Sequence, residues 1–221
     1  MKNIGELAYY LTVFAISILV VRCLVYWGMS LLRHERKAHS REGIWFSRIV
    51  RLFTVLSITA SPLVLGWSIE LLIIWLLIVL LAVITITDYY YMLIPDKALL
   101  LFGLLILGLR VFFPLGYWWE GIVGAVIGFI ITYLIALISR GGLGGGDIKL
   151  MTVIGLVIGW QGVFLTLGMA SFFGAVRMVI GFIRGEFKEK NPQIAFGPFI
   201  ALSAVVYIFG SKLFTIMISN L

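Results

Sequence analysis

The chain has 221 residues, of which 62% are hydrophobic and 12% are charged, and its mean hydropathy is +1.13. Soluble domains carry about 25% charged residues, so this composition excludes an ordinary soluble domain, and the apolar content excludes a disordered chain. The formal net charge is +7. In a membrane protein such an excess of basic residues reports the orientation of the loops, so we expect no nucleic-acid partner.

Apolar runs follow one another along the whole chain, and a helical span needs about 20 mostly apolar residues. In chain order, the predicted spans cover residues 7–32, 49–66, 69–87, 97–113, 121–139, 148–160, 162–183 and 194–218. The sequence therefore predicts an all-α fold, a polytopic integral membrane bundle of about eight transmembrane helices. We expect residues 1–221 to form a single membrane domain.

The basic residues indicate how the chain crosses the membrane. If the loop after the first span is cytoplasmic, alternation of the spans puts 12 of the 17 Lys and Arg residues on that side. They are Arg33, Arg36, Lys37, Arg41, Arg48, Arg51, Lys97, Arg140, Lys149, Arg184, Lys188 and Lys190. Basic residues favour cytoplasmic loops, so both termini are expected to face away from the cytoplasm.

Three of the ten acidic residues, Asp88, Asp96 and Asp147, lie at the predicted cytoplasmic ends of spans. Charged side chains are costly at membrane depth, so these are the first candidates for function. Asp96 follows Pro95 at a predicted helix start, where capping is favoured over catalysis. Asp88 ends a helix, where the helix dipole disfavours a negative charge. Some other feature must therefore account for Asp88.

Asp147 follows a run with five glycines in six residues, 141–146. This run is either a flexible linker capped by Asp147 or part of a functional site. It lacks the Gly-x-x-x-x-Gly-Lys-Ser/Thr pattern of a phosphate-binding loop. Two aspartates at one membrane depth can instead act as in aspartic proteases, where one carboxylate activates water and the other supplies a proton.

The sequence gives little support for a metal site or for a bound cofactor. The single cysteine, Cys23, cannot form an intramolecular disulfide. His34 and His39 lie five residues apart in a strongly basic loop, and two histidines alone make a poor metal constellation. We therefore predict no metal and no cofactor. The basic loop between Arg33 and Arg51 is expected to attract anionic lipids, at roughly 1 kcal/mol for each basic residue near the surface.

Three sequence elements resemble a known family. The run 144–147 (Gly-Gly-Gly-Asp) matches the Gly-x-Gly-Asp signature of the intramembrane aspartic proteases, and residues 144–150 resemble the version found in bacterial type IV prepilin leader peptidases. Asp88 with the Ile-Pro-Asp sequence at 94–96 resembles a second element of that family, and residues 195–199 (Ala-Phe-Gly-Pro-Phe) resemble a third. The resemblance covers about residues 50–215.

The resemblance implies a membrane-embedded aspartic endopeptidase with Asp88 and Asp147 as its catalytic pair. Its expected partners are prepilin or pseudopilin precursors, cleaved after a glycine at the cytoplasmic face of the bacterial inner membrane. Residues 1–50 would hold the first span and the basic loop, and residues 51–221 the catalytic core. The substrate-binding or supporting residues are expected to be Gly144, Gly146, Lys149, Asp96, Pro95, Phe196, Gly197 and Pro198.

One feature departs from the larger members of that family. They carry two Cys-x-x-Cys pairs between the first two spans, in a domain associated with N-methylation, whereas the loop between Arg33 and Arg51 contains no cysteine. The sequence therefore resembles a minimal form that acts as a peptidase alone. Two alternatives remain: a transporter or proton/cation pathway with Asp88 and Asp147 as relay groups, and a non-catalytic assembly factor.

Overall fold

In the computed structural model, the described residues are 2–31, 41–66, 68–113, 117–140, 142–185 and 194–219. They form seven helices, and no strand occurs in these ranges. The helices are α1 (Lys2–Leu31), α2 (Arg41–Leu65), α3 (Glu70–Tyr91), α4 (Asp96–Phe112), α5 (Trp118–Ile138), α6 (Gly145–Ile183) and α7 (Gly197–Ser219). Six of these helices are long and apolar enough to cross a membrane. The protein is therefore an all-helical, multi-pass membrane protein, as predicted.

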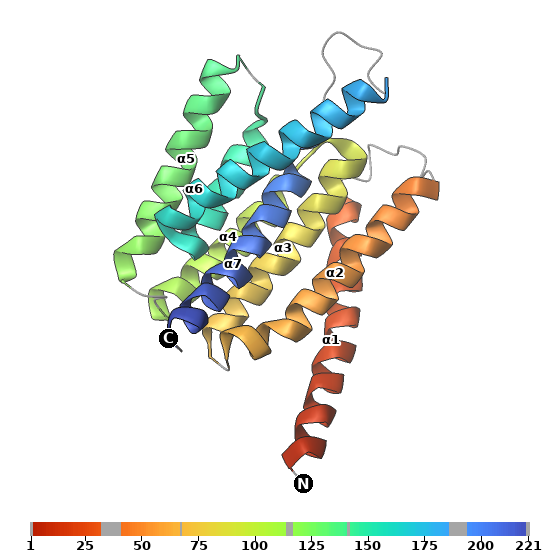
Figure 1. The fold of residues 1–221 in the computed structure, drawn as a ribbon, viewed down its shortest axis with the longest axis vertical. Helices are drawn as coiled ribbons and strands as arrows, with labels where there is room; N and C mark the ends of the chain where they lie inside the picture. The colour runs from red at the N-terminus through yellow and green to blue at the C-terminus, as the bar shows by residue number, and fades with distance from the viewer. Residues whose placement is uncertain are drawn as a thin grey trace.

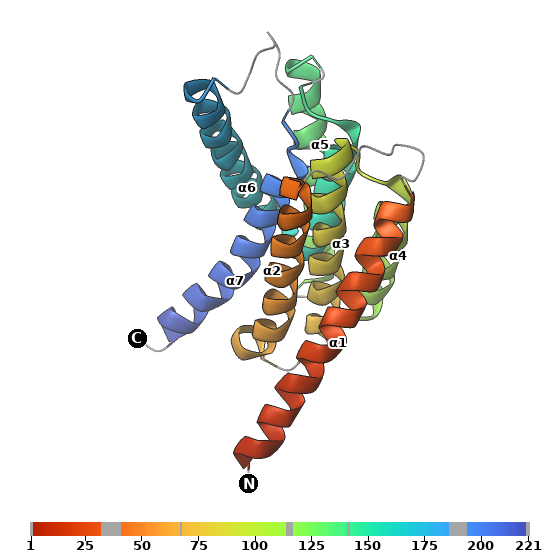
Figure 2. The same ribbon diagram turned by 90° about the vertical axis from the view of Figure 1, so that its right-hand side faces the viewer.

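Helix α3 lies at the centre of the bundle and contacts α1, α2, α4, α6 and α7 (Figure 2). Its residues from Leu77 to Asp88 are all buried, which explains why this span is apolar on every face. The start of α1 and the end of α7 lie toward the same end of the bundle (Figure 1). The C-terminal end of α3, whose last turn contains Asp88, lies toward the opposite end.

Helix α6 contains two predicted spans, 148–160 and 162–183, in one element of 39 residues. The count of seven helices differs from the predicted eight for this reason. The break between the two arms is at Gly159, where φ is 71° and ψ is 179°, a conformation that is essentially restricted to glycine. Figure 1 shows the chain folding back on itself along α6.

Close backbone packing holds the first arm of α6 against α5. The backbones of Gly124 and Gly155 are in direct contact, and a Cβ atom added to Gly128 would lie 2.6 Å from the carbonyl oxygen of Met151. The second arm packs elsewhere, because Gly174 contacts the ring of Phe196, just before α7. The two arms therefore have different neighbours.

Arg110 of α4 satisfies backbone carbonyls that the break in α6 leaves free. Its Nε donates a hydrogen bond to the carbonyl oxygen of Leu156 at 2.9 Å, and a terminal nitrogen donates to that of Val157 at 3.3 Å. The last carbonyls of a helix have no partner within that helix. Arg110 thus acts as a C-terminal cap for the first arm, a role that the sequence analysis did not detect.

We expect Arg110→Met to lower the free energy of unfolding by about 2 kcal/mol, because buried carbonyl groups would lose their hydrogen-bond donor. Thermal unfolding of the purified protein in detergent measures this effect as a lower melting temperature. Gly108→Ala is the control on the same helix, since nothing lies within 4 Å of a Cβ atom added there. An unchanged melting temperature for Arg110→Met would contradict the capping role.

Helix α2 begins at Arg41, eight residues before the predicted span at 49–66. The predicted loop between Arg33 and Arg51 is therefore partly helical. Hydropathy marks only the apolar part of a helix, whereas the basic first turns of α2 are held by aromatic packing of Phe46 on Tyr89, with ring centroids 3.9 Å apart. The two histidines considered as metal ligands, His34 and His39, lie outside the described residues.

Candidate active site

The three sequence elements singled out above meet at one end of the bundle. The element containing Asp88 touches the start of α7, where the backbone N–H of Gly197 donates to Asp88. It also touches the start of α6, because a Cβ atom added to Gly146 would lie 2.8 Å from the Cβ of Ile94. The fold thus brings together residues that are more than 100 positions apart in the sequence.

Asp88 is buried, with 6% of its surface exposed. Its Oδ2 accepts a hydrogen bond of 2.8 Å from the N–H of Gly197, the first residue of α7. The N-terminal end of a helix carries partial positive charge and unpaired N–H groups. Asp88 lies in the last turn of α3, which continues to Tyr91, and its side chain faces the start of α7. This contact compensates for the unfavourable position of Asp88 on its own helix.

Asp147 lies in the first turn of α6 and is also buried, with 8% of its surface exposed. Its Oδ2 accepts a hydrogen bond of 3.2 Å from the N–H of Gly144. Its Oδ1 is buried and has no hydrogen-bond partner among the described residues. Asp147 thus caps its helix with one oxygen and leaves the other available, so capping and chemistry are compatible at this position.

The two buried carboxylates lie in neighbouring parts of the bundle, because the segment after Asp88 contacts the start of α6, which carries Asp147, through Ile94 and Gly146. Like charges in a shared, poorly hydrated site do not both ionise readily. Such a pair can hold one proton between two carboxyl groups, the arrangement that lets one act as a base and the other as an acid. In the described part of the chain, no cluster of three or more His, Cys, Asp or Glu side chains could hold a metal ion.

Asp96 and Lys149 form an exposed ion pair beside this site. The Nζ of Lys149 lies 2.7 Å from Oδ1 of Asp96, and the two side chains are 55% and 69% exposed. Asp96 occupies the first turn of α4, as predicted, after Pro95 at the N-cap position. Lys149, which the sequence predicts to bind substrate or support the site, binds Asp96 in this structure and so links the starts of α4 and α6.

The role of Gly197 was not specified by the sequence analysis. A Cβ atom added to it would lie 2.8 Å from Oδ2 of Asp88, so only glycine allows this approach without displacing the carboxylate. The signal in the sequence was Pro198, because proline is common in the first turn of a helix and marks a helix start. Phe196 lies partly buried at the N-terminal boundary of α7.

The comparisons with known proteins agree with this arrangement. The profile described as the type IV leader peptidase family matches residues 75–179, which include both buried aspartates. A Bacillus subtilis protein named prepilin leader peptidase/N-methyltransferase is 33% identical over 168 residues, covering 76% of this chain and 67% of that protein. The chain belongs to the type IV leader peptidase family.

Two further relatives have the same name. The Aeromonas salmonicida protein is 32% identical over 69% of this chain, and the Aeromonas hydrophila protein is 33% identical over 70%. The matched regions cover 52% and 55% of those two proteins, so the chain spans about half of their length. No solved structure gives a significant match.

Proposed function

We propose that this protein is a membrane-embedded aspartic endopeptidase that removes the short basic leader from type IV prepilin-like precursors, cleaving after a glycine. The observation that carries the proposal is the pair of buried carboxylates, Asp88 and Asp147, each held by the N–H of a glycine at a helix start. Membership of a leader peptidase family supports the substrate class.

In the proposed reaction, Asp88 and Asp147 share one proton. The ionised carboxylate takes a proton from water as the water oxygen attacks the carbonyl carbon of the leader glycine. The protonated carboxyl group gives its proton to the carbonyl oxygen, which forms a tetrahedral diol. When the C–N bond breaks, the new amine of the mature precursor takes the proton that the pair holds, and the diol gives a hydroxyl proton to the other carboxylate as its C=O bond forms again. The pair then holds one proton, as it did at the start.

We place the active site at the cytoplasmic face of the bacterial inner membrane. The support is the distribution of basic residues, since Lys97, Arg140 and Lys149 lie close in sequence to the helix ends around Asp88 and Asp147, and basic residues favour the cytoplasmic side. A basic leader in the cytoplasm and an apolar helix in the membrane would present the scissile bond at this boundary.

The proposal is for a peptidase without N-methyltransferase activity. The names of the relatives include both activities, but the stretch from Arg33 to Arg51, both included, contains no cysteine and is only 19 residues long. The transporter alternative has no support from the comparisons, in which the matched family and the relatives are peptidases.

The test is whether the purified protein in liposomes cleaves a synthetic precursor. This precursor has a basic leader that ends in glycine and is followed by an apolar helix. Mass spectrometry is expected to show one cut after the glycine and, with a methyl donor present, a product without an added methyl group. A precursor with the glycine replaced by leucine is the matched control and should stay intact. Absence of cleavage by the folded protein, together with proton flux across the liposomes, would favour the transporter alternative.

A further inference from the structure

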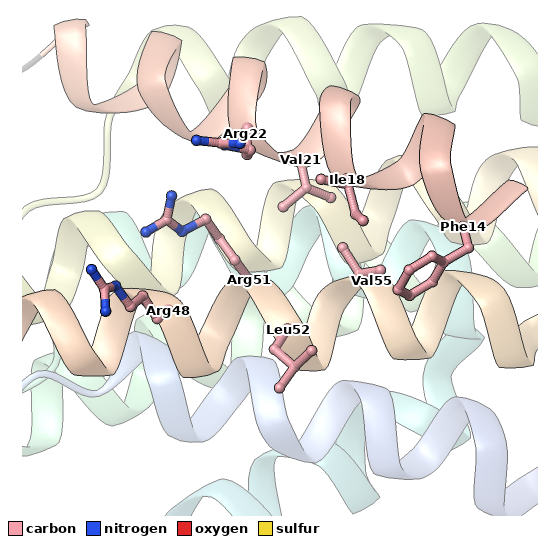
Figure 3. A pocket seen from close by; sticks show the side chains of 8 residues that line it. All are labelled: Phe14, Ile18, Val21, Arg22, Arg48, Arg51, Leu52 and Val55. Carbon is pink, nitrogen blue, oxygen red and sulfur yellow. The ribbon is translucent and has the colours of Figure 1, made fainter. Parts of the chain in front are cut away.

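A groove of about 420 Å³ lies between α1 and α2, away from the residues of the proposed reaction. Its two ends differ in chemistry. Arg22, Arg48 and Arg51 line one end, and Phe14, Ile18 and Val55 are among the apolar residues that line the rest. Figure 3 shows the three guanidinium groups gathered toward one end of the groove, with the apolar side chains following along the helices.

The three arginines come from two different helices, and neighbouring side chains orient the two on α2. The Nε of Arg51 donates to the carbonyl oxygen of Ser47 at 3.0 Å, and a terminal nitrogen donates to the Ser47 hydroxyl at 3.3 Å. The guanidinium group of Arg48 lies 5.7 Å from the ring centroid of Trp45. These contacts orient the side chains of Arg48 and Arg51, and they use only two of the N–H groups of Arg51.

Among the side chains that the structure describes, no carboxylate forms an ion pair with these three arginines. Arg22 and Arg48 are exposed, and Arg51 is partly exposed, so their donors can reach a ligand. Three like charges gathered at one end of a groove repel one another unless an anion lies between them. Guanidinium groups bind phosphate through paired N–H donors, which makes phosphate the best match for this end.

The apolar part of the groove limits the nature of the anion. Free phosphate would have no contact with Phe14, Ile18 or Val55, whereas an acyl chain would cover them. A phospholipid has both parts in the same order, because its phosphate lies at the membrane boundary and its chains extend toward the centre. Arg22 lies within the apolar span 12–31, about two turns before its end, and an arginine at this depth extends its head group toward the interface.

We propose that the groove between α1 and α2 binds one anionic phospholipid, with its phosphate among Arg22, Arg48 and Arg51 and an acyl chain along Phe14, Ile18 and Val55. Binding at this site would be more specific than the general attraction of a basic loop to anionic lipids, because the lining residues lie on facing sides of two helices. It is independent of cleavage, because none of its residues touches Asp88 or Asp147.

Native mass spectrometry of the purified protein tests this proposal. The protein is released from detergent in the presence of phosphatidylglycerol or of phosphatidylcholine, and the two lipids have the same acyl chains. We expect one phosphatidylglycerol retained per protein, with an affinity at least about tenfold above that for phosphatidylcholine. The double variant Arg22→Gln/Arg48→Gln should lose this preference. The control Lys97→Gln/Arg140→Gln removes the same charge near the same end of the bundle, outside the groove, and should keep it.

A second variant separates the lipid from a free anion. Ile18→Trp fills the apolar part of the groove without changing its charge, so it should weaken phosphatidylglycerol binding at least about fivefold. Equal retention of both lipids by the wild-type protein, or undiminished retention by Arg22→Gln/Arg48→Gln, would overturn the proposal. Displacement of the lipid by millimolar inorganic phosphate, with no effect of Ile18→Trp, would assign the site to a free anion. Thermal unfolding checks that each variant is folded.

Discussion

Asp88→Asn and Asp147→Asn are each expected to lower the rate of precursor cleavage by at least about a thousandfold, near the upper part of the range for the loss of a general acid or base. An amide cannot take a proton from water or supply one to the leaving amine. It keeps the shape of the carboxyl group and a carbonyl oxygen that can accept the hydrogen bond from Gly197 or Gly144. The loss should therefore be in catalysis rather than in folding.

The measurement is initial cleavage rate in liposomes, with melting temperature in detergent as the check on folding. Glu70→Gln makes the same chemical change at the opposite end of α3 and should cleave at a rate close to that of the wild-type protein. If either aspartate variant kept more than about a tenth of the wild-type rate, that aspartate could not be an acid or base in the reaction. The loss of precursor cleavage in both variants would also remove the non-catalytic assembly factor as an alternative.

Gly197→Ala is expected to lower the cleavage rate about a hundredfold while the bundle stays folded. The added methyl group would lie 2.8 Å from Oδ2 of Asp88, so the carboxylate or the start of α7 must move. A displacement of about 1 Å at a reacting group can cost about a hundredfold in rate. The substitution should lower kcat and leave KM for the precursor nearly unchanged, because it displaces the reacting carboxylate and not the residues that bind the rest of the precursor.

Gly210→Ala is the matched control, since it makes the same change in the same helix at a position where nothing lies within 4 Å. It should cleave like the wild-type protein and melt at the same or a slightly higher temperature, because alanine favours helix. A Gly197→Ala protein that cleaves at the wild-type rate would mean that the contact between α7 and Asp88 does not position the carboxylate during the reaction.

The sequence by itself determined the class of the fold. Apolar runs of span length depend on local composition and on the cost of unpaired backbone groups in lipid, so they can be found without knowing which helices are neighbours. The short sequence elements around Asp88 and Asp147 can also be found in this way, because each consists of residues that are adjacent or close together in the sequence. The break at Gly159 was placed within a few residues, because a glycine-rich interruption of an apolar run is also a local signal.

Only the tertiary structure decided which residues hold the site together. Gly197 lies 109 positions from Asp88, and Arg110 lies 46 positions from Leu156, so no local pattern links either pair. The ion pair of Asp96 with Lys149 also depends on how α4 and α6 meet. Hydropathy fixes which segments cross the membrane, whereas hydrogen bonds and close packing between distant segments fix how they meet.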